Sequence, residues 1–194
     1  MKKNLKFIII GVVVIGLIVG YYLYLSNKPN NASGEEVTTG ITQAQKLLAR
    51  SMATDYPPTP KEVVKYYADL TVAFYTSDYT DEEFEKLADR LRDLFDAELL
   101  AANPREYYIQ SLKNEIDKYK SQGSAISSYA TSASTDVDYG RVNGYDCAKL
   151  RATFTLKNGA NVALIKEIFI LRKDEDGHYK IYGWKLADDE QTEN

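Results

Sequence analysis

The spacing of the apolar residues changes once, near Gly123, and this change constrains the fold more than any other feature of the chain. Between residues 59 and 122, apolar side chains recur every three to four positions, as on one face of a helix. After Gly123 they alternate with polar side chains, as in a half-buried strand. The sequence therefore predicts three helices followed by strands, the order of an α+β domain with its helices on one face of an antiparallel sheet.

Each of the three helices is preceded by a capping signal, in which a capping side chain stands three residues before a glutamate. The signals are Thr59-Pro60-Lys61-Glu62, Thr80-Asp81-Glu82-Glu83 and Asn103-Pro104-Arg105-Glu106. The second helix carries an apolar stripe from Phe84 to Leu99 with the spacing of a helix face. We therefore expect that helix to continue as far as Leu99.

Four strands are expected to form an antiparallel meander. Alternation predicts the first strand from Tyr129 to Tyr139 and the second, with one dry and one wet face, from Tyr145 to Lys157. Asn158-Gly159 is a hairpin turn signal. The third strand, Asn161 to Lys173, is apolar on both faces, which predicts that both faces are covered. Tyr179 to Leu186 closes the sheet.

The N-terminal part of the chain contains an uncharged apolar run of 19 residues, Phe7 to Leu25. As a helix it would span roughly 28 Å, close to the hydrocarbon thickness of a bilayer. Lys2, Lys3 and Lys6 precede the run, which predicts a cytoplasmic N-terminus and a C-terminal domain outside the cell membrane. The alternative is a cleaved signal peptide, but bulky residues follow the run where a small-x-small cleavage site would stand.

Gly16 and Gly20 form a GxxxG pair that could let two such helices approach closely, although small residues are common in membrane helices. The expected organisation has six segments. They are a cytoplasmic stub at 1–6, a transmembrane helix at 7–25, a tether at 26–41, a short helix with a proline-rich turn at 42–58, the domain at 59–187 and an acidic tail at 188–194.

Charge and composition exclude several classes of function. Residues 1–34 contain four lysines and no acid, so the rest of the chain carries 20 basic and 28 acidic residues. An acidic body is unsuited to binding nucleic acid. One cysteine and one histidine in the whole chain exclude an internal disulfide framework and multi-Cys or multi-His metal sites. We expect no cofactor and no metal.

No catalytic constellation is apparent. A Cys147–His178 dyad would need an orienting third group, which nothing in the sequence indicates. Asp174-Glu175-Asp176-Gly177 lacks the later ligands of a calcium loop and is interpreted as a turn. The remaining candidate acids are best interpreted as solvated surface groups; they are Asp69, Asp136, Asp138 and Asp146.

The element order, together with a last strand that reads DGHYKIYGWKL, resembles the nuclear-transport-factor-two-like (SnoaL-like, cystatin-like) superfamily. The resemblance covers about residues 59–187 and implies a curved sheet wrapped around a long helix to form a cone. Enzymes with this fold place Asp, His or Tyr inside the cone. Three further segments resemble a group of uncharacterised single-pass membrane proteins of Firmicutes that is defined as a domain of unknown function; they are residues 56–64, 96–103 and 169–173.

The chain contains 16 tyrosines, which could fill a half-wet core in place of phenylalanine or line a cavity. If the cone holds a pocket, Tyr67, Tyr129 and Trp184 are the expected walls. The sequence favours a membrane-anchored interaction or assembly module, without catalysis, that binds a protein partner or a second copy. The alternatives are binding or transformation of a small apolar ligand in the cone and, with only about six cytoplasmic residues, a transmembrane sensor.

Overall fold

All α-helices precede all strands in the part of the chain that the structure describes, residues 41–187 of a computed structural model. The helices are α2 (Gln43–Leu48), α3 (Pro60–Thr76), α4 (Asp81–Arg92), α5 (Ala97–Ala102) and α6 (Arg105–Ser121). The strands are β1 (Ser124–Thr131), β2 (Asp138–Val142), β3 (Tyr145–Asn158), β4 (Asn161–Lys173) and β5 (Tyr179–Leu186). The predicted α+β class is confirmed, with more helices and strands than expected.

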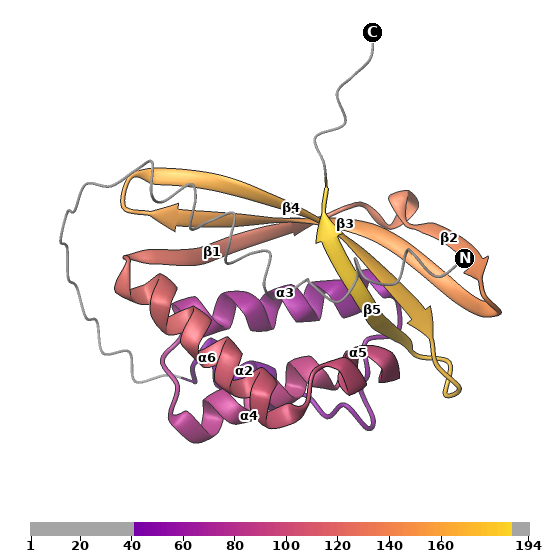
Figure 1. The fold of residues 1–194 in the computed structure, drawn as a ribbon, viewed down its shortest axis with the longest axis horizontal. Helices are drawn as coiled ribbons and strands as arrows, with labels where there is room; N and C mark the ends of the chain where they lie inside the picture. Colours follow the sequence, from indigo (N-terminus) through magenta and orange to yellow (C-terminus); the bar gives the residue numbers. More distant parts are fainter. Residues whose placement is uncertain (1–40, 188–194) are drawn as a thin grey trace, which may run out of the picture.

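The strands form one antiparallel sheet in the order β1-β3-β4-β5, and β2 also pairs with β3. Figure 1 shows the sheet on one side of the molecule and the labelled helices on the other. The longest inward-facing row is on β3, where Ala148, Leu150, Ala152, Phe154 and Leu156 are all buried. The predicted dry face of this strand is therefore confirmed.

Two predicted caps are confirmed and one is wrong. Thr59 caps α3 with Pro60 in the first turn, and Thr80 and Glu83 form a complete capping box at α4. Helix α6 forms as predicted, but its first residue follows Pro104 and no side chain caps it. The Asn103 amide instead donates to the Leu99 carbonyl over 2.9 Å, at the end of α5.

The prediction that one helix runs to Leu99 is wrong. Helix α4 ends at Arg92, and the next residues pass beside β5, where Phe95 forms an isolated parallel bridge with Ile181. Ile181 donates to the Leu94 carbonyl over 2.7 Å, and the Asp96 N–H donates to the Ile181 carbonyl over 2.9 Å. These long-range bonds replace the helical ones, and Asp96 then caps the separate helix α5.

The predicted first strand is interrupted, so the sheet has five strands and not four. A short 3₁₀ turn, Ser134–Asp136, separates β1 from β2. Strand β1 pairs with the second half of β3, and β2 pairs with its first half, so the two strands occupy the same edge. The alternating pattern continues through the turn because its residues are small and polar, which hides the break.

The prediction that both faces of β4 are covered is wrong within residues 41–187. The inward residues Glu167, Phe169 and Leu171 are buried, but outward Val162 and Leu164 are 58% and 62% exposed. The labelled helices lie on the inner side of the sheet (Figure 1), and outward Val162 and Leu164 lack cover from them.

Between residues 41 and 187, none of the helices combines the length and the apolar character that crossing a bilayer requires. The predicted transmembrane helix at 7–25, with Gly16 and Gly20, lies outside the described residues. So do the stub, nearly all of the tether, and the acidic tail at 188–194.

Candidate functional site

The candidate site is a groove of about 960 Å³ at one end of the sheet. Three segments enclose it: the connection from α4 to α5, the turn between β2 and β3, and the turn between β4 and β5. We call it the strand-end groove. Most of its walls are charged, including Asp93, Glu98, Asp146, Arg172, Asp174 and Lys180.

Arg172 on β4 connects the groove to the fold. Its guanidinium binds both carboxylate oxygens of Asp96, with a Nε–Oδ2 distance of 3.2 Å, and its Nη1 donates to Glu98 over 3.0 Å. The Arg172 and Asp96 side chains are each only 11% exposed. A forked arginine–carboxylate contact fixes both distance and orientation, so Arg172 holds the start of α5 against the sheet.

Two tyrosine rings flank the same guanidinium. Its carbon lies 3.9 Å from the centre of the Tyr182 ring and 4.4 Å from that of Tyr145. Stacking on aromatic faces adds to the ion pair because the ring face is electronegative. Tyr145 is 44% exposed and lines the groove, so it presents an aromatic surface next to a buried charge.

The opposite wall is built around Lys180. Its ammonium donates to the Asp93 carbonyl over 2.8 Å and lies 4.2 Å from the centre of the Tyr56 ring. Burial lowers the pKa of Lys180, while nearby carboxylates such as Asp174 oppose that shift. The Tyr56 hydroxyl donates to the Tyr179 carbonyl over 2.9 Å, which fixes the ring against β5.

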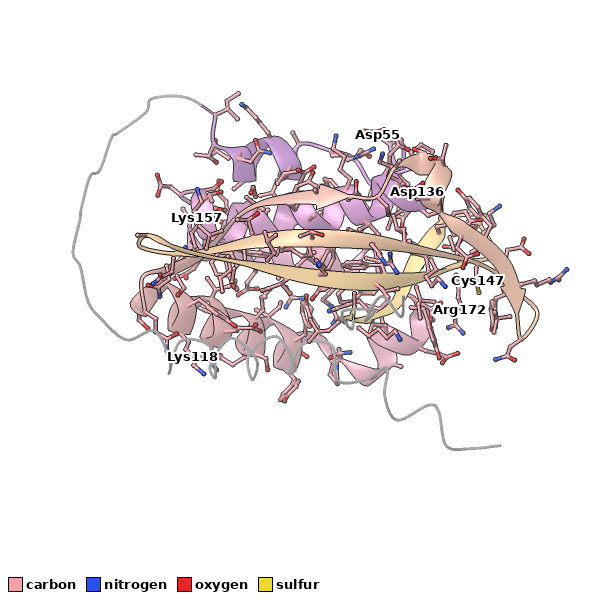
Figure 2. The ribbon with its side chains drawn as sticks, turned by 90° about the horizontal axis from the view of Figure 1, so that it is seen from above. Asp55, Lys118, Asp136, Cys147, Lys157 and Arg172 are labelled. Atoms are coloured by element: carbon pink, nitrogen blue, oxygen red, sulfur yellow. The ribbon has the colours of Figure 1, made fainter. Side chains whose placement is uncertain are left out.

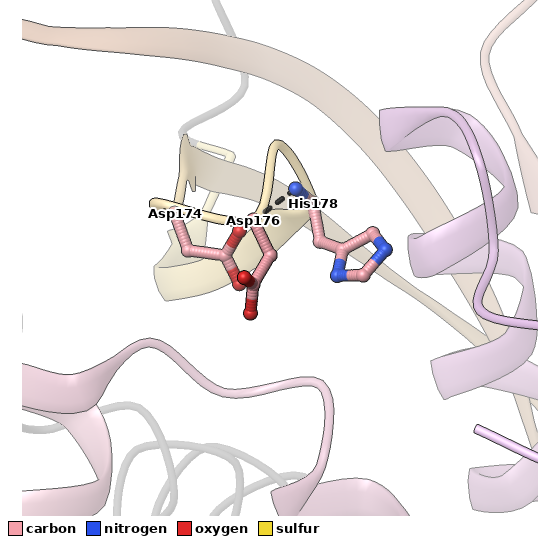
Figure 3. Close-up of side chains that lie close together, drawn as sticks. All are labelled: Asp174, Asp176 and His178. Carbon is pink, nitrogen blue, oxygen red and sulfur yellow. Dashed lines mark hydrogen bonds between the residues drawn. The ribbon is translucent and has the colours of Figure 1, made fainter. Parts of the chain in front are cut away.

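Asp174, Asp176 and His178 come together in the turn beside the groove (Figure 3). Each offers a ligand atom, and these atoms lie within 4.8 Å of one another, so the three could bind a metal ion. However, Asp174 already accepts from the His178 N–H over 2.8 Å, and the His178 ring packs on Tyr56 with centroids 4.4 Å apart. The bonds Asp174 N–H to His178 carbonyl and Gly177 N–H to Asp174 carbonyl close the predicted turn.

The three predicted pocket residues do not lie together. Tyr67 and Trp184 contact each other inside the domain, with ring centroids 5.4 Å apart, and Phe169 packs against both. Tyr129 lies on β1, where its hydroxyl donates to Asp69 over 2.6 Å. None of the three lines the strand-end groove. Their role as walls of a cone pocket therefore stays a prediction.

The Cys147 and His178 side chains contact different residues. The Cys147 thiol lies 3.5 Å from the Tyr145 carbonyl, whereas the His178 ring packs on Tyr56. Figure 2 shows Cys147 near Arg172, at the groove end of the sheet. Asp146 lines the groove and Asp138 pairs with Lys149 over 2.9 Å, so both lie at the surface, as predicted for these acids.

Sequence reasoning missed a buried carboxyl group inside the domain, Glu167, and a half-buried one, Glu115, that interacts with it electrostatically. Glu167 is 1% exposed on the inward face of β4, and burial raises its pKa to about 8, with a further increase from Glu115. Burial also raises the pKa of Glu115, on α6, to about 7. The indole N–H of Trp184, in the same aromatic interior, has no hydrogen-bond partner among residues 41–187. The parity of β4 places Glu167 on the row of Phe169 and Leu171, which is the signal that could have found it.

The comparisons with known proteins identify a family. A family model described as a domain of unknown function, DUF6715, matches residues 1–184. No curated protein matches the chain. Because the model covers nearly the whole sequence, the chain belongs to this family.

Proposed function

We propose that this member of the DUF6715 family is a non-catalytic interaction module, anchored in the membrane by residues 7–25 and displayed outside the cell. In this account the strand-end groove holds a segment of a partner protein. The one-sided packing of the helices on an antiparallel sheet supports the further proposal of a nuclear-transport-factor-two-like cone. Fold alone assigns no activity, so the argument for binding depends on the groove.

The single observation that carries the proposal is the strand-end groove itself. It is formed by backbone turns and by a buried ion-pair network, so its walls are held in place before a partner arrives. A binding surface that is already ordered loses less conformational entropy when it binds. Tyr145 supplies an exposed aromatic ring, a residue type enriched at protein interfaces.

The charges of the groove favour a basic partner segment. Its carboxylates outnumber its cationic groups, and two of the cations are engaged inside the domain. Arg172 is held by Asp96 and Glu98, and the Lys180 ammonium donates to a backbone carbonyl. The exposed carboxylates that remain at the rim can pair with lysine or arginine; they include Asp146 and Glu175.

Photo-crosslinking in cells tests this proposal on the full chain. A photoreactive phenylalanine analogue is placed at Tyr145, or at Tyr107 on α6, which is 68% exposed and lies outside the groove. We expect a discrete crosslinked partner at position 145 and not at 107. Replacing both Asp146 and Glu175 with lysine should remove that crosslink. The same products at both positions, or none at 145, would contradict the proposal.

The alternative of a small apolar ligand in the cone has one supporting observation, the buried polar groups of Glu167 and Trp184 in an apolar interior. Aromatic rings fill the space around them, since Tyr67, Phe95 and Phe169 all pack on Trp184. A ligand would therefore have to displace these rings. Fluorescence of the single tryptophan, titrated with a series of apolar compounds, tests this alternative: saturable quenching supports it, and an unchanged spectrum contradicts it.

A further inference from the structure

The outward face of the sheet has a charge opposite to that of the rest of the domain. Side chains alternate along a strand, so the outward positions are the odd-numbered ones of β3 from 147 to 157 and the even-numbered ones of β4 from 162 to 172. Four of these positions carry exposed basic residues and none carries a carboxylate, although residues 35–194 have more acids than bases. The fifth base, Arg172, is buried against Asp96 and Glu98 and does not belong to the exposed face. Lys185 of β5, opposite Ile168, extends the same face.

The face is also exposed and partly apolar. We define the basic sheet face as Lys149, Arg151, Lys157, Val162, Leu164, Lys166 and Lys185, all of which are exposed. Val162 and Leu164 are 58% and 62% exposed, and Ile168 and Ile170 beside them are half-buried. Figure 2 looks onto the sheet, with Lys157 at one end and Cys147 at the other. Asp138 of β2 pairs with Lys149 at the Cys147 end.

Basic side chains around exposed aliphatic ones form the combination that holds proteins on an anionic membrane surface. The lysines attract the headgroups, and the aliphatic side chains enter the boundary between headgroups and acyl chains. We propose that the basic sheet face lies on the anionic headgroups of the membrane in which the chain is anchored. This inference rests on the anchored placement proposed above, but it concerns a surface other than the strand-end groove.

The length of the tether allows this contact. Residues 26–41 form a segment of sixteen residues that would reach roughly 50 Å when extended. The tether enters the domain at α2, which packs on α3 and α4 on the helix side. The sheet is separated from the outermost helices by roughly 20 Å, the sum of two layer spacings. The chain can therefore pass around the domain and place the sheet on the bilayer.

The test uses the full chain inserted as one copy per lipid nanodisc, in phosphatidylcholine alone or with phosphatidylglycerol. Cys147→Ser removes the native thiol, and Leu164→Cys or Tyr107→Cys provides a single exposed probe. We expect phosphatidylglycerol to slow thiol labelling at position 164 several-fold, and high salt to restore the rate. Position 107, on α6, should be labelled at the same rate in both lipids.

Charge reversal separates lipid contact from a general charge effect. Lys157→Glu with Lys185→Glu should abolish the protection of position 164. Lys46→Glu with Lys65→Glu makes the same charge change on helices α2 and α3 and should preserve it.

The outcomes distinguish this inference from the proposed function. A chain that does not stay with the nanodisc would contradict the anchored placement itself. A chain that stays with the disc and is labelled equally in both lipids would overturn only the contact of the sheet face. Protection of position 164 in both lipids would indicate that a segment of the same chain covers the face, and would also overturn it. Protection only in discs that hold two copies would assign the face to a second copy.

Discussion

Arg172 shows how one residue can order a whole end of the domain. It binds Asp96, which at the same time caps α5 by accepting the Glu98 N–H over 2.9 Å. A buried guanidinium that loses its carboxylate, or the reverse, leaves a charge without a partner in a medium of low dielectric constant. The groove and the start of α5 therefore depend on the same contact.

Replacing Arg172 with alanine should lower the free energy of unfolding by about 3 kcal/mol or more, because Asp96 would keep a buried charge without its partner. Arg141→Ala provides the control, since that side chain is 74% exposed and its nearest ion pair measures 4.0 Å. The control should change stability by less than about 1 kcal/mol. Denaturant titration of both variants measures the difference; equal losses would contradict the structural role of Arg172.

Glu167 makes stability depend on pH in a direction opposite to that of most carboxylates. Its pKa rises from an ordinary 4.5 to about 8 in the folded chain, so folding favours the protonated form. The contribution of protonated Glu167 to the free energy of unfolding is complete below about pH 4.5 and is lost progressively as the pH rises towards 8. Glu115, whose folded pKa is about 7, acts in the same direction over a narrower range.

The free energy of unfolding should fall as the pH rises from 5 to 8. In Glu167→Gln this fall should be smaller, because only Glu115 still contributes to it. One proton contributes a slope of at most about 1.4 kcal/mol per pH unit. Thermal unfolding across this range measures the slope, and Glu106→Gln, on the exposed side of α6, is the control. If the slope of Glu167→Gln equals that of the unmodified chain, the carboxyl at position 167 is not protonated in the fold.

The contact between Arg172 and Asp96 was hard to predict from the sequence. Arg172 and Asp96 are 76 positions apart, and no periodic pattern links a helix start to a particular position in a distant strand. Each of the two residues had only a local signal. Arg172 is a cation in an apolar strand, and Asp96 stands two residues before Glu98. Tyr67 and Trp184, two of the three expected pocket walls, contact each other because both belong to strong apolar rows, whereas Tyr129 follows the weaker alternation of β1.

At the scale of the elements, the capping signals at Thr59 and Thr80 were confirmed, whereas the one at Asn103 was not. Thr80 accepts from the Glu83 N–H over 3.2 Å, and the Glu83 carboxylate accepts from the Thr80 N–H over 2.9 Å. This reciprocal pair is local, so tertiary contacts do not compete with it. The backbone bonds of Leu94 and Asp96 to Ile181 are not local, and they end α4 although its apolar pattern continues.

Thr80→Ala should destabilise the domain by about 1 kcal/mol, because the first turn of α4 loses a hydrogen-bond acceptor. Thr80→Ser keeps the hydroxyl and should restore most of the loss. The stabilities are compared by chemical denaturation, with helical circular dichroism as the readout. A serine variant as unstable as the alanine variant would show that the methyl group of Thr80, and not its hydroxyl, is what matters.

At the scale of the whole molecule, the sequence predicted the order of elements and the one-sided packing but not the segregation of charge. Net charge averages over all surfaces, and only the registers of β3 with β4 and of β4 with β5 bring Lys157, Lys166 and Lys185 to one face. The same register corrects the interpretation of β4. Its aliphatic outward residues do not indicate burial under described helices; they form the surface that we place on the membrane.

The central claim is that the domain is displayed outside a membrane that residues 7–25 cross. Two single-cysteine variants in a Cys147→Ser chain test it in intact cells, with a thiol reagent that does not cross membranes. Tyr107→Cys, at an exposed position of α6, should be labelled in intact cells. Asn4→Cys, before the apolar run, should be labelled only after permeabilisation. Labelling of position 107 that also requires permeabilisation would contradict the account.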